Sequence, residues 1–563
     1  MASRAWFAWG GRSRRGAASA SNPPEQRTTG IWRWRWGIAL VSGAAVGSAY
    51  PPTILGPLAW IAFVPLLAVL DEAIQRGGRW GVVLYLFGWA WHGAANWWVM
   101  SWQPETDPYL MVAGAVLWLV HPLFLIPALA LYPMLRKRVM PRRWALAVMV
   151  AGFVAVEWLH SLGDLSYPWL ALGYTQLRNL ALAQIADLAG VWGVSLVVIA
   201  LNAVIYDWVA DALERRRTVL ASPGRAALHL GGRMLAVLIV PLVYGVVRLL
   251  DFTLSPAPPL RIALVQANIN PWRKWAYADM QPMLAEHRRL QDSLRRHASF
   301  DLAIWSETAL PVNLLDASGA ELLQQIRSWC DSTGTAVLTG FADVEGYHPV
   351  RAYNAAILVA PKAVHFPVHR KSRLTPFGEY MPFSDAFPEL ARLLQWGVGI
   401  SSWAKGPGAT VLPLIRGDTL ARLGVMICIE SIYPSYAADY VRAGADVLVV
   451  ITNDAWYDGT PGPDQHFAIA QMRAIETRRP IARCANSGRT GFIAPTGRVL
   501  QRAPARVATC IAAPVIPQRG TTFYVRAGDW LPMCMGIGGL AMIAAWGITQ
   551  RRWRVRSADG GDE

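Results

Sequence analysis

Long apolar stretches with few charges recur through the first 252 residues of the chain and return once near its end. A helix needs about 20 consecutive apolar residues to cross the hydrocarbon core of a bilayer. We therefore expect a multi-pass α-helical membrane bundle of about eight spans, with about seven of them before residue 253. The expected spans are residues 37–50, 53–70, 81–102, 109–135, 144–161, 186–206, 234–250 and 529–548.

The basic residues are concentrated in every second connection between these stretches. Short connections rich in Lys and Arg stay on the cytoplasmic side of a membrane. The connections between them hold only one basic residue, Arg178. Both termini are therefore expected in the cytoplasm, and the net charge of +16 indicates topology rather than nucleic-acid binding. Fourteen of these charges lie in residues 1–36, 71–80, 135–144, 207–233 and 551–563.

These patterns divide the chain into five segments. The first 36 residues are rich in Arg and Ser, but no convincing small-residue cleavage site follows them, so we expect them to be retained. The expected segments are a basic cytoplasmic extension (1–36), a transmembrane bundle (37–252), an external domain (253–527), a final transmembrane helix (528–550) and a cytoplasmic tail (551–563).

The expected external domain has a different pattern of apolar and polar residues from the rest of the chain. From Leu260 onward, short strand-like runs alternate with amphipathic helices, which is typical of an α/β domain. Strands are expected at residues 260–267, 301–305, 335–341, 353–360, 421–429, 446–452, 491–495 and 509–514, and helices at 279–298, 317–333, 433–443 and 464–478.

Residues 376–404 interrupt this alternation with an apolar segment that includes Phe383 and Trp396. Gly397 and Gly399 are its candidate pivots. Two interpretations stay open: a packed loop helix, or a lid or arm that dips into the bilayer interface beside a functional site.

The cysteines show no disulfide framework and no zinc-ligand spacing. At least one free thiol is therefore expected in the external domain, and no metal or cofactor is expected. The five cysteines are Cys330, Cys428, Cys484, Cys510 and Cys534.

Three reactive side chains stand at or near the ends of expected strands: Glu307, Lys371 and Cys428. A free thiol is a weak nucleophile near neutral pH and needs a base within hydrogen-bond reach. Glu307 is the candidate base, because burial raises a carboxyl pKa toward the useful range. Lys371 is the candidate cation that stabilises the thiolate and an oxyanion.

Two residues beside the cysteine are expected to support this chemistry. The backbone N–H of Ile429 would join Lys371 at the oxyanion. Glu430 lies two residues beyond Cys428, so on a strand it would share the face of the cysteine and orient Lys371 or a substrate group.

Each of the three residues also has a structural interpretation. A lone cysteine in an apolar strand is usually a small buried hydrophobe. Glu307 would then cap the following loop, and Lys371 would be a solvated member of a basic run. Spacing alone does not bring the three together.

The combination Trp-x-Glu, Arg-Lys-x-x-Leu and Cys-x-Glu resembles the nitrilase superfamily, whose members use a Glu–Lys–Cys triad on an αββα sandwich. More narrowly, the chain resembles the apolipoprotein N-acyltransferase family of the bacterial inner membrane. The similarity covers nearly the whole chain after the first 36 residues. It is carried by Lys371–Pro382, Thr452–Trp456, Gln465–Phe467, Tyr167–Gln176 and Asn96–Trp97.

The resemblance implies a role for each matched residue. Cys428 would be the nucleophile that takes an acyl chain from a phospholipid as a thioester. Glu307 would be the general base, and Lys371 would stabilise the oxyanion. Glu379 matches a further active-site acid, and Trp275 matches a tryptophan near the substrate entry.

Glu430 also matches an active-site acid of the family. The acceptor would be the α-amino group of the diacylglyceryl-modified N-terminal cysteine of an apolipoprotein. The resemblance further implies an enzyme of the inner membrane with its catalytic domain on the periplasmic side. We expect a monomer.

The sequence departs from the family pattern at several positions. Ile429 stands where a tyrosine is common, Ser306 replaces a proline, and Arg373 replaces a histidine. None of these changes removes a group that the mechanism needs. Glu157 and His160 fall in an expected span, where ionisable groups are costly; we interpret them as structural, paired with each other or with nearby backbone.

Two other functions stay open at this stage. One is a membrane-anchored amidase or nitrilase in which water replaces the amine. The other is a transporter or scaffold whose outer domain only binds a ligand.

Overall fold

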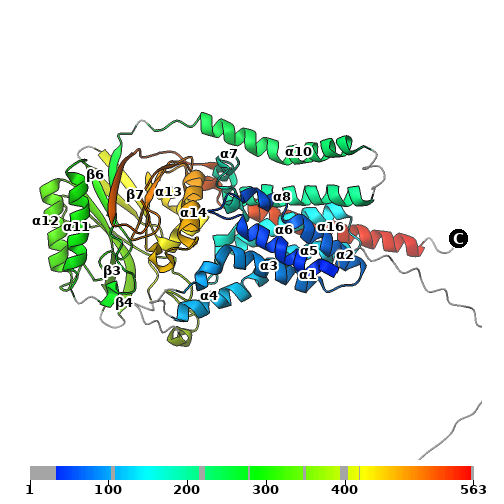
Figure 1. Cartoon of the computed structure of the whole chain (residues 1–563), viewed down its shortest axis with the longest axis horizontal. Coiled ribbons are helices and arrows are strands. Elements are labelled where there is room, and N and C mark those ends of the chain that lie inside the picture. The colour runs from blue at the N-terminus through cyan, green and yellow to red at the C-terminus, as the bar shows by residue number, and fades with distance from the viewer. Residues whose placement is uncertain are drawn as a thin grey trace, which may run out of the picture.

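The computed structural model describes residues 33–102, 108–214, 222–255, 257–276, 279–346, 350–393, 403–416 and 419–559. Most of the expected extension (1–36), the last four residues of the expected tail (551–563) and the expected pivots Gly397 and Gly399 lie outside these ranges. The described chain is elongated, with a helical bundle at one end and an α/β part at the other (Figure 1).

All eight expected apolar segments are largely helical. The segment expected at 109–135 is two consecutive helices, because Pro122 begins a new helix after His121. The segment expected at 234–250 is longer and begins at Pro223. The helices are α1 (Arg35–Ser48), α2 (Phe63–Gln75), α3 (Trp80–Asn96), α4 (Pro108–Val120), α5 (Pro122–Lys137), α6 (Arg142–Leu159), α7 (Leu180–Ala183), α8 (Ala186–Glu214), α10 (Pro223–Leu250) and α16 (Trp530–Asp559).

Several of these helices can cross a membrane. Five in the described part of the chain are long and apolar enough to do so. Helices α1 and α3 have only 14 and 17 residues, so the expected count of about eight spans is not established by helix length. The five are Gly56–Gln75, Leu110–Lys137, Ala186–Glu214, Gly224–Leu250 and Trp530–Arg552.

Small residues hold α1 against α3. A Cβ atom added at Gly43 would lie 2.1 Å from the carbonyl oxygen of Phe87, and one added at Gly47 would lie 2.4 Å from that of Trp91. Such contacts let two helix backbones approach closely, which is a common means of helix packing in membranes.

The α/β part contains two six-stranded sheets. Their strand orders are β12-β1-β2-β3-β4-β5 and β11-β10-β9-β8-β7-β6. The strands are β1 (Leu260–Gln266), β2 (Leu302–Trp305), β3 (Ala336–Glu345), β4 (Arg351–Val359), β5 (Val368–Arg370), β6 (Val411–Arg416), β7 (Thr419–Ile427), β8 (Val447–Thr452), β9 (Ile481–Ala485), β10 (Gly491–Ile493), β11 (Val499–Arg502) and β12 (Thr509–Val515).

All eight expected strands are present, with shifted ends, and four further strands were not expected: β5, β6, β9 and β11. Strand β9 is fully buried in the centre of its sheet. The sequence obscures it because the charged residue Arg483 interrupts its short apolar run, although that side chain is buried.

The two sheets pack face to face, and helices cover both outer faces. Leu, Ile and Val side chains from both sheets form one buried cluster between them. Helices α11 (Gln281–Arg295) and α12 (Ala320–Thr333) pack on the outer face of the first sheet. Helices α13 (Pro434–Arg442) and α14 (Gly462–Thr477) cover the second (Figure 1). The expected αββα sandwich is therefore confirmed.

Helices α13 and α14 also face the membrane bundle. One buried apolar cluster contains residues of α13, α14 and the bundle helices. Polar contacts cross the same interface: the Val191 N–H donates to Glu476 Oε1 at 2.8 Å, and Arg478 Nη2 is paired with Asp187 Oδ2 at 2.6 Å. The bundle and the sandwich therefore share one continuous interior.

A Gly43→Val substitution tests the α1–α3 packing. We expect it to lower the free energy of unfolding by about 1–3 kcal/mol, because the side chain would collide with the backbone of α3. Gly37→Val on the same helix is the control, since a Cβ there meets no described atom within 4 Å. Thermal unfolding in detergent would measure both; equal midpoints would refute the close approach.

Candidate active site

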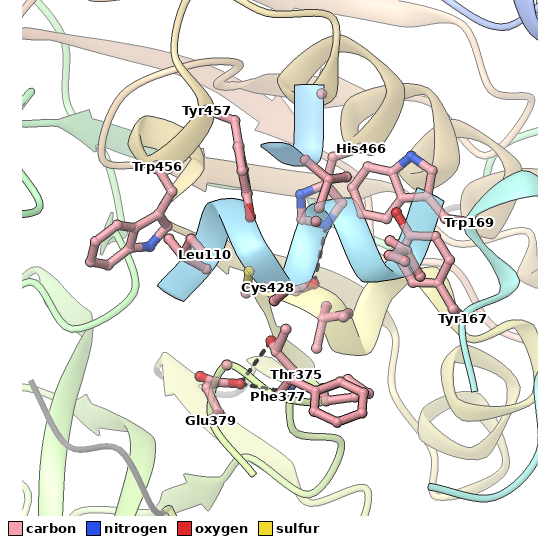
Figure 2. A pocket seen from close by; sticks show the side chains of 18 of the residues that line it. Leu110, Tyr167, Trp169, Thr375, Phe377, Glu379, Cys428, Trp456, Tyr457 and His466 are labelled. Carbon is pink, nitrogen blue, oxygen red and sulfur yellow. Dashed lines mark hydrogen bonds between the residues drawn. The ribbon is translucent and has the colours of Figure 1, made fainter. Parts of the chain in front are cut away.

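The structure brings Glu307, Lys371 and Cys428 to one cavity of about 600 Å³. Glu307 follows β2, Lys371 follows β5 and Cys428 follows β7. Lys371 is fully buried and Glu307 is 5% exposed. Figure 2 shows the side chains of Cys428 and Glu379 with those of other residues that line the cavity, among them Trp456, Tyr457 and His466.

Lys371 is held between two carboxylates. Its Nζ atom lies 3.1 Å from Glu307 Oε1 and 2.8 Å from Glu379 Oε1. Burial alone would lower the pKa of Lys371, but these two carboxylates outweigh it and leave the pKa above its ordinary value. Lys371 therefore stays charged at neutral pH.

Glu307 is fixed by further donors. Asn354 Nδ2 donates to Glu307 Oε1 at 2.7 Å, and the Asn453 N–H donates to Glu307 Oε2 at 3.0 Å. Behind it, the buried Lys274 Nζ donates to the carbonyl oxygen of Thr308 at 3.0 Å. Burial lowers the pKa of Lys274 to about 8. The donors from Asn354 and Asn453 thus give the Glu307 carboxylate a defined orientation.

The sequence predicted that Cys428 lies on a strand, but the structure places it just beyond the end of one. Strand β7 ends at Ile427, and Cys428 begins a short 3₁₀ turn that extends to Ile432. The cysteine has a φ of 53°, in the left-handed region that non-glycine residues rarely adopt. The expectation of a strand at 421–429 is wrong at its end because the chain turns sharply at the thiol.

The Cys428 thiol is neutral at rest. Burial raises its pKa, Glu307 adds to this effect, and the Lys371 ammonium opposes it only partly. A thiol in this state reacts only when a base removes its proton. The Glu307 carboxylate, which lines the same cavity, can serve as that base.

Glu430 lies behind the cavity and does not line it. Since Cys428 is in a turn, the prediction that Glu430 shares its strand face is wrong. Glu430 Oε1 accepts the N–H groups of Ser372 at 2.7 Å and Arg373 at 3.2 Å, while Oε2 accepts that of Ile427 at 2.8 Å. It therefore joins the segment after Lys371 to the segment before Cys428.

The remaining predicted residues line the cavity. Glu379 Oε2 accepts the Thr375 N–H at 2.9 Å and its hydroxyl at 3.0 Å (Figure 2). Ile429 also lines the cavity. Trp275 does so beside Trp403, with the ring centroids 6.1 Å apart.

The membrane bundle supplies another wall of the cavity. The lining residues of this wall lie on α4, between α4 and α5, and at the start of α5. They are apolar except for His121, which is buried. They are Leu110, Val112, Ala113, Gly114, Val116, Leu117, Val120, His121 and Phe124.

Glu157 and His160 do not pair with each other. Glu157 Oε1 accepts the backbone N–H of Leu172 at 2.7 Å. The ring of His160 stacks on that of His121, with centroids 4.4 Å apart. The interpretation of Glu157 as structural and bound to nearby backbone agrees with this arrangement.

All five cysteines are free thiols. Burial raises the pKa of Cys330 and of Cys510 to about 12, and neither thiol lies in the cavity with Glu307. Cys428 is the cysteine that lines the described cavity.

Comparisons with known proteins identify the family of the chain. Residues 42–204 match the apolipoprotein N-acyltransferase N-terminal domain model, and residues 261–520 match the carbon-nitrogen hydrolase model. An apolipoprotein N-acyltransferase of Chlorobaculum tepidum is 33% identical over 90% of this chain and 96% of its own. The chain belongs to the apolipoprotein N-acyltransferase family.

A second relative of the same family and two more distantly similar solved structures were also found. An apolipoprotein N-acyltransferase of Azotobacter vinelandii is 31% identical over 93% of this chain and 96% of its own. Among solved structures, yeast Nit3 of the nitrilase superfamily is 15% identical, with a TM-score of 0.36, and covers 49% of this chain and 94% of its own. An amidase from Nesterenkonia AN1 has 16% identity and a TM-score of 0.34 over 50% of this chain and 95% of its own.

A Glu379→Gln substitution tests the charge balance at Lys371. The amide keeps an oxygen acceptor but removes one of the two carboxylates that raise the pKa of Lys371, so this pKa falls. We expect the alkaline limb of the pH–activity profile to move to lower pH by about one unit, so that kcat/KM at a pH on that limb is about tenfold lower, or about 1.4 kcal/mol.

Glu345→Gln is the matched control. It removes a carboxylate that is paired with Arg370, one residue from Lys371, and that is 56% exposed. Its pH profile should match that of the unchanged protein. An alkaline limb that does not move in Glu379→Gln would contradict the proposed charge balance.

Proposed function

We propose that this protein moves a fatty acyl chain from a phospholipid, through a thioester on Cys428, to the α-amino group of the diacylglyceryl-modified cysteine of apolipoproteins. The observation that carries this proposal is the position of the Glu307–Lys371 pair. It lies with Cys428 in a cavity that also has an apolar wall from the membrane helices α4 and α5. A water-soluble substrate would not need that wall.

In the first half-reaction, Glu307 takes the thiol proton as Sγ attacks the ester carbonyl of the phospholipid. The Lys371 ammonium and the Ile429 N–H stabilise the oxyanion. The C–O bond of the ester then breaks, and Glu307 returns the proton to the leaving alcohol of the lysophospholipid. Cys428 keeps the acyl group as a thioester.

In the second half-reaction, the neutral amine of the lipoprotein attacks the thioester carbonyl. Glu307 accepts a proton from the amine, the C–S bond breaks, and the proton passes to the departing thiolate. An amide and a free Cys428 result. Because the first product leaves before the amine reacts, the kinetics are ping-pong.

Both substrates carry acyl chains, so the cavity should open toward the bilayer. Trp275 would lie near the entry, and residues 376–404 would act as the arm that covers it. We further propose eight spans, cytoplasmic termini and a periplasmic catalytic domain at 253–527 in a monomer of the bacterial inner membrane. The basic connections support this orientation.

Acyl-enzyme trapping tests the chemistry. Purified protein incubated with phospholipid should gain one acyl mass on Cys428, and a diacylated lipopeptide should discharge it. Cys428→Ser should lose more than about 10³-fold in activity, because the nucleophile is removed. Intact-protein and peptide mass spectrometry would measure the adduct.

Cys510→Ser is the control, because this thiol lies outside the cavity and should not be needed. Release of free fatty acid without acylated lipopeptide would point to hydrolysis and contradict the transferase. Activity that survives Cys428→Ser would contradict a thioester.

Cysteine labelling tests the orientation. In a Cys534→Ser background, Gln324→Cys on α12 should react with a membrane-impermeant maleimide in spheroplasts. Arg138→Cys, after α5, should react only once the membrane is permeabilised. Both introduced positions are exposed. The reverse pattern would overturn the proposed topology.

A further inference from the structure

Gln465 of α14 makes its side-chain hydrogen bonds to the membrane bundle. Its Oε1 atom accepts the indole N–H of Trp98 at 3.1 Å and that of Trp169 at 2.8 Å. Its Nε2 atom donates to the carbonyl oxygen of Ala95 at 2.9 Å. All of these groups are buried. Gln465 therefore fixes the start of α14 against α3 and the loops beside it.

The next residue, His466, reaches in the other direction, to the nucleophile (Figure 2). Its Nε2 atom lies 3.2 Å from the carbonyl oxygen of Cys428 and 2.9 Å from Ser431 Oγ. Ser431 Oγ also donates to the Cys428 carbonyl, at 2.9 Å. Since a carbonyl oxygen can only accept, the network assigns a proton to Nε2 of His466.

The far side of the imidazole ring is held as well. With the proton on Nε2, His466 Nδ1 accepts from Arg483 Nη2 at 2.9 Å, and Asp454 Oδ1 lies 3.1 Å from the same nitrogen. Asp454 and Arg483 are themselves a buried ion pair. The ring therefore cannot rotate without breaking these contacts, and it holds the Cys428 carbonyl in a fixed place.

The other end of the nucleophile turn is also tied to the bundle. The Ile432 carbonyl oxygen accepts the Tyr174 hydroxyl at 3.4 Å and Arg473 Nη1 at 2.9 Å. The next residue, Tyr433, has its hydroxyl 3.1 Å from Ser166 Oγ. Tyr174 and Ser166 both belong to the segment between α6 and α7.

We propose that the membrane bundle positions the nucleophile, with Gln465 and His466 as the positioning residues. The left-handed backbone of Cys428 is strained and persists only where its surroundings enforce it. Here the bundle holds α14 through Gln465, and α14 holds the Cys428 carbonyl through His466. The bundle is then a part of the catalytic apparatus as well as an anchor. This proposal rests on the assignment of Cys428 as the nucleophile.

The test uses the full chain in proteoliposomes and two readouts. The first is the single-turnover rate of Cys428 acylation by phospholipid, together with kcat and KM. The second is the rate of Cys428 alkylation by iodoacetamide, which needs no lipid substrate. The variants are Gln465→Leu, His466→Leu, His466→Gln and the pair Trp98→Phe with Trp169→Phe.

We expect Gln465→Leu and His466→Leu to slow both acylation and alkylation at least tenfold, with less than a twofold change in KM. His466→Gln should recover part of the loss, because its amide can still donate to the Cys428 carbonyl. The paired Trp→Phe variant keeps both rings and removes only the N–H donors, so it should slow alkylation in the same direction without unfolding the protein.

Gln471→Leu is the matched control. Gln471 lies on the same helix and donates to the carbonyl oxygen of Gly497 at 2.8 Å. It should leave both rates unchanged. Normal alkylation in the Gln465 and paired tryptophan variants, with only KM altered, would overturn the positioning role. If the unchanged protein is alkylated but never acylated, the proposed function fails while the positioning remains testable.

Discussion

The site depends on the ion pairs that the buried Lys371 ammonium forms with the carboxylates of Glu307 and Glu379. Removing one partner of a buried ion pair costs about 3–5 kcal/mol, because a charge is left uncompensated. The sheets satisfy this requirement by bringing distant strand ends together. Asn354 adds a neutral donor to both carboxylates. The geometry that this ion pair requires also places a base and a cation in the cavity of the Cys428 thiol.

The sequence predicts the parts of this molecule that follow from general constraints. Apolar helices and the alternation of strands and helices were predictable because a bilayer and an α/β core each impose a repeating pattern, whereas the αββα layers were expected only through the resemblance. The chemistry of Glu307, Lys371 and Cys428 marked them as candidates, but before the structure only the resemblance placed the three in one site. Asn354 was missed, although a single amide within the apolar β4 run was a usable signal. The turn at Cys428 was missed because left-handed backbone at a cysteine depends on tertiary contacts that no local pattern encodes.

The strained turn and the rigid network behind it are complementary features. A side chain on a sharp turn is presented clear of the strand, which leaves room for a bulky substrate such as the proposed lipid ester. The cost of such a backbone must be offset by contacts elsewhere. In this protein those contacts reach through α14 into the membrane helices. Contacts made by loop segments of the bundle, including the one that contains Trp169, therefore help to offset the free-energy cost of the strained Cys428 backbone.

The shared interior between α14 and the bundle has a consequence for how this protein can be divided. The outer face of α13 and α14 is apolar, and Glu476 and Arg478 find partners across the interface. Without the bundle helices, the sandwich would expose this apolar face and leave Glu476 and Arg478 without their partners in the bundle. We therefore expect the separated sandwich to aggregate. A soluble version of this domain therefore cannot be obtained by truncation alone, because the outward-facing residues of α13 and α14 must also be replaced.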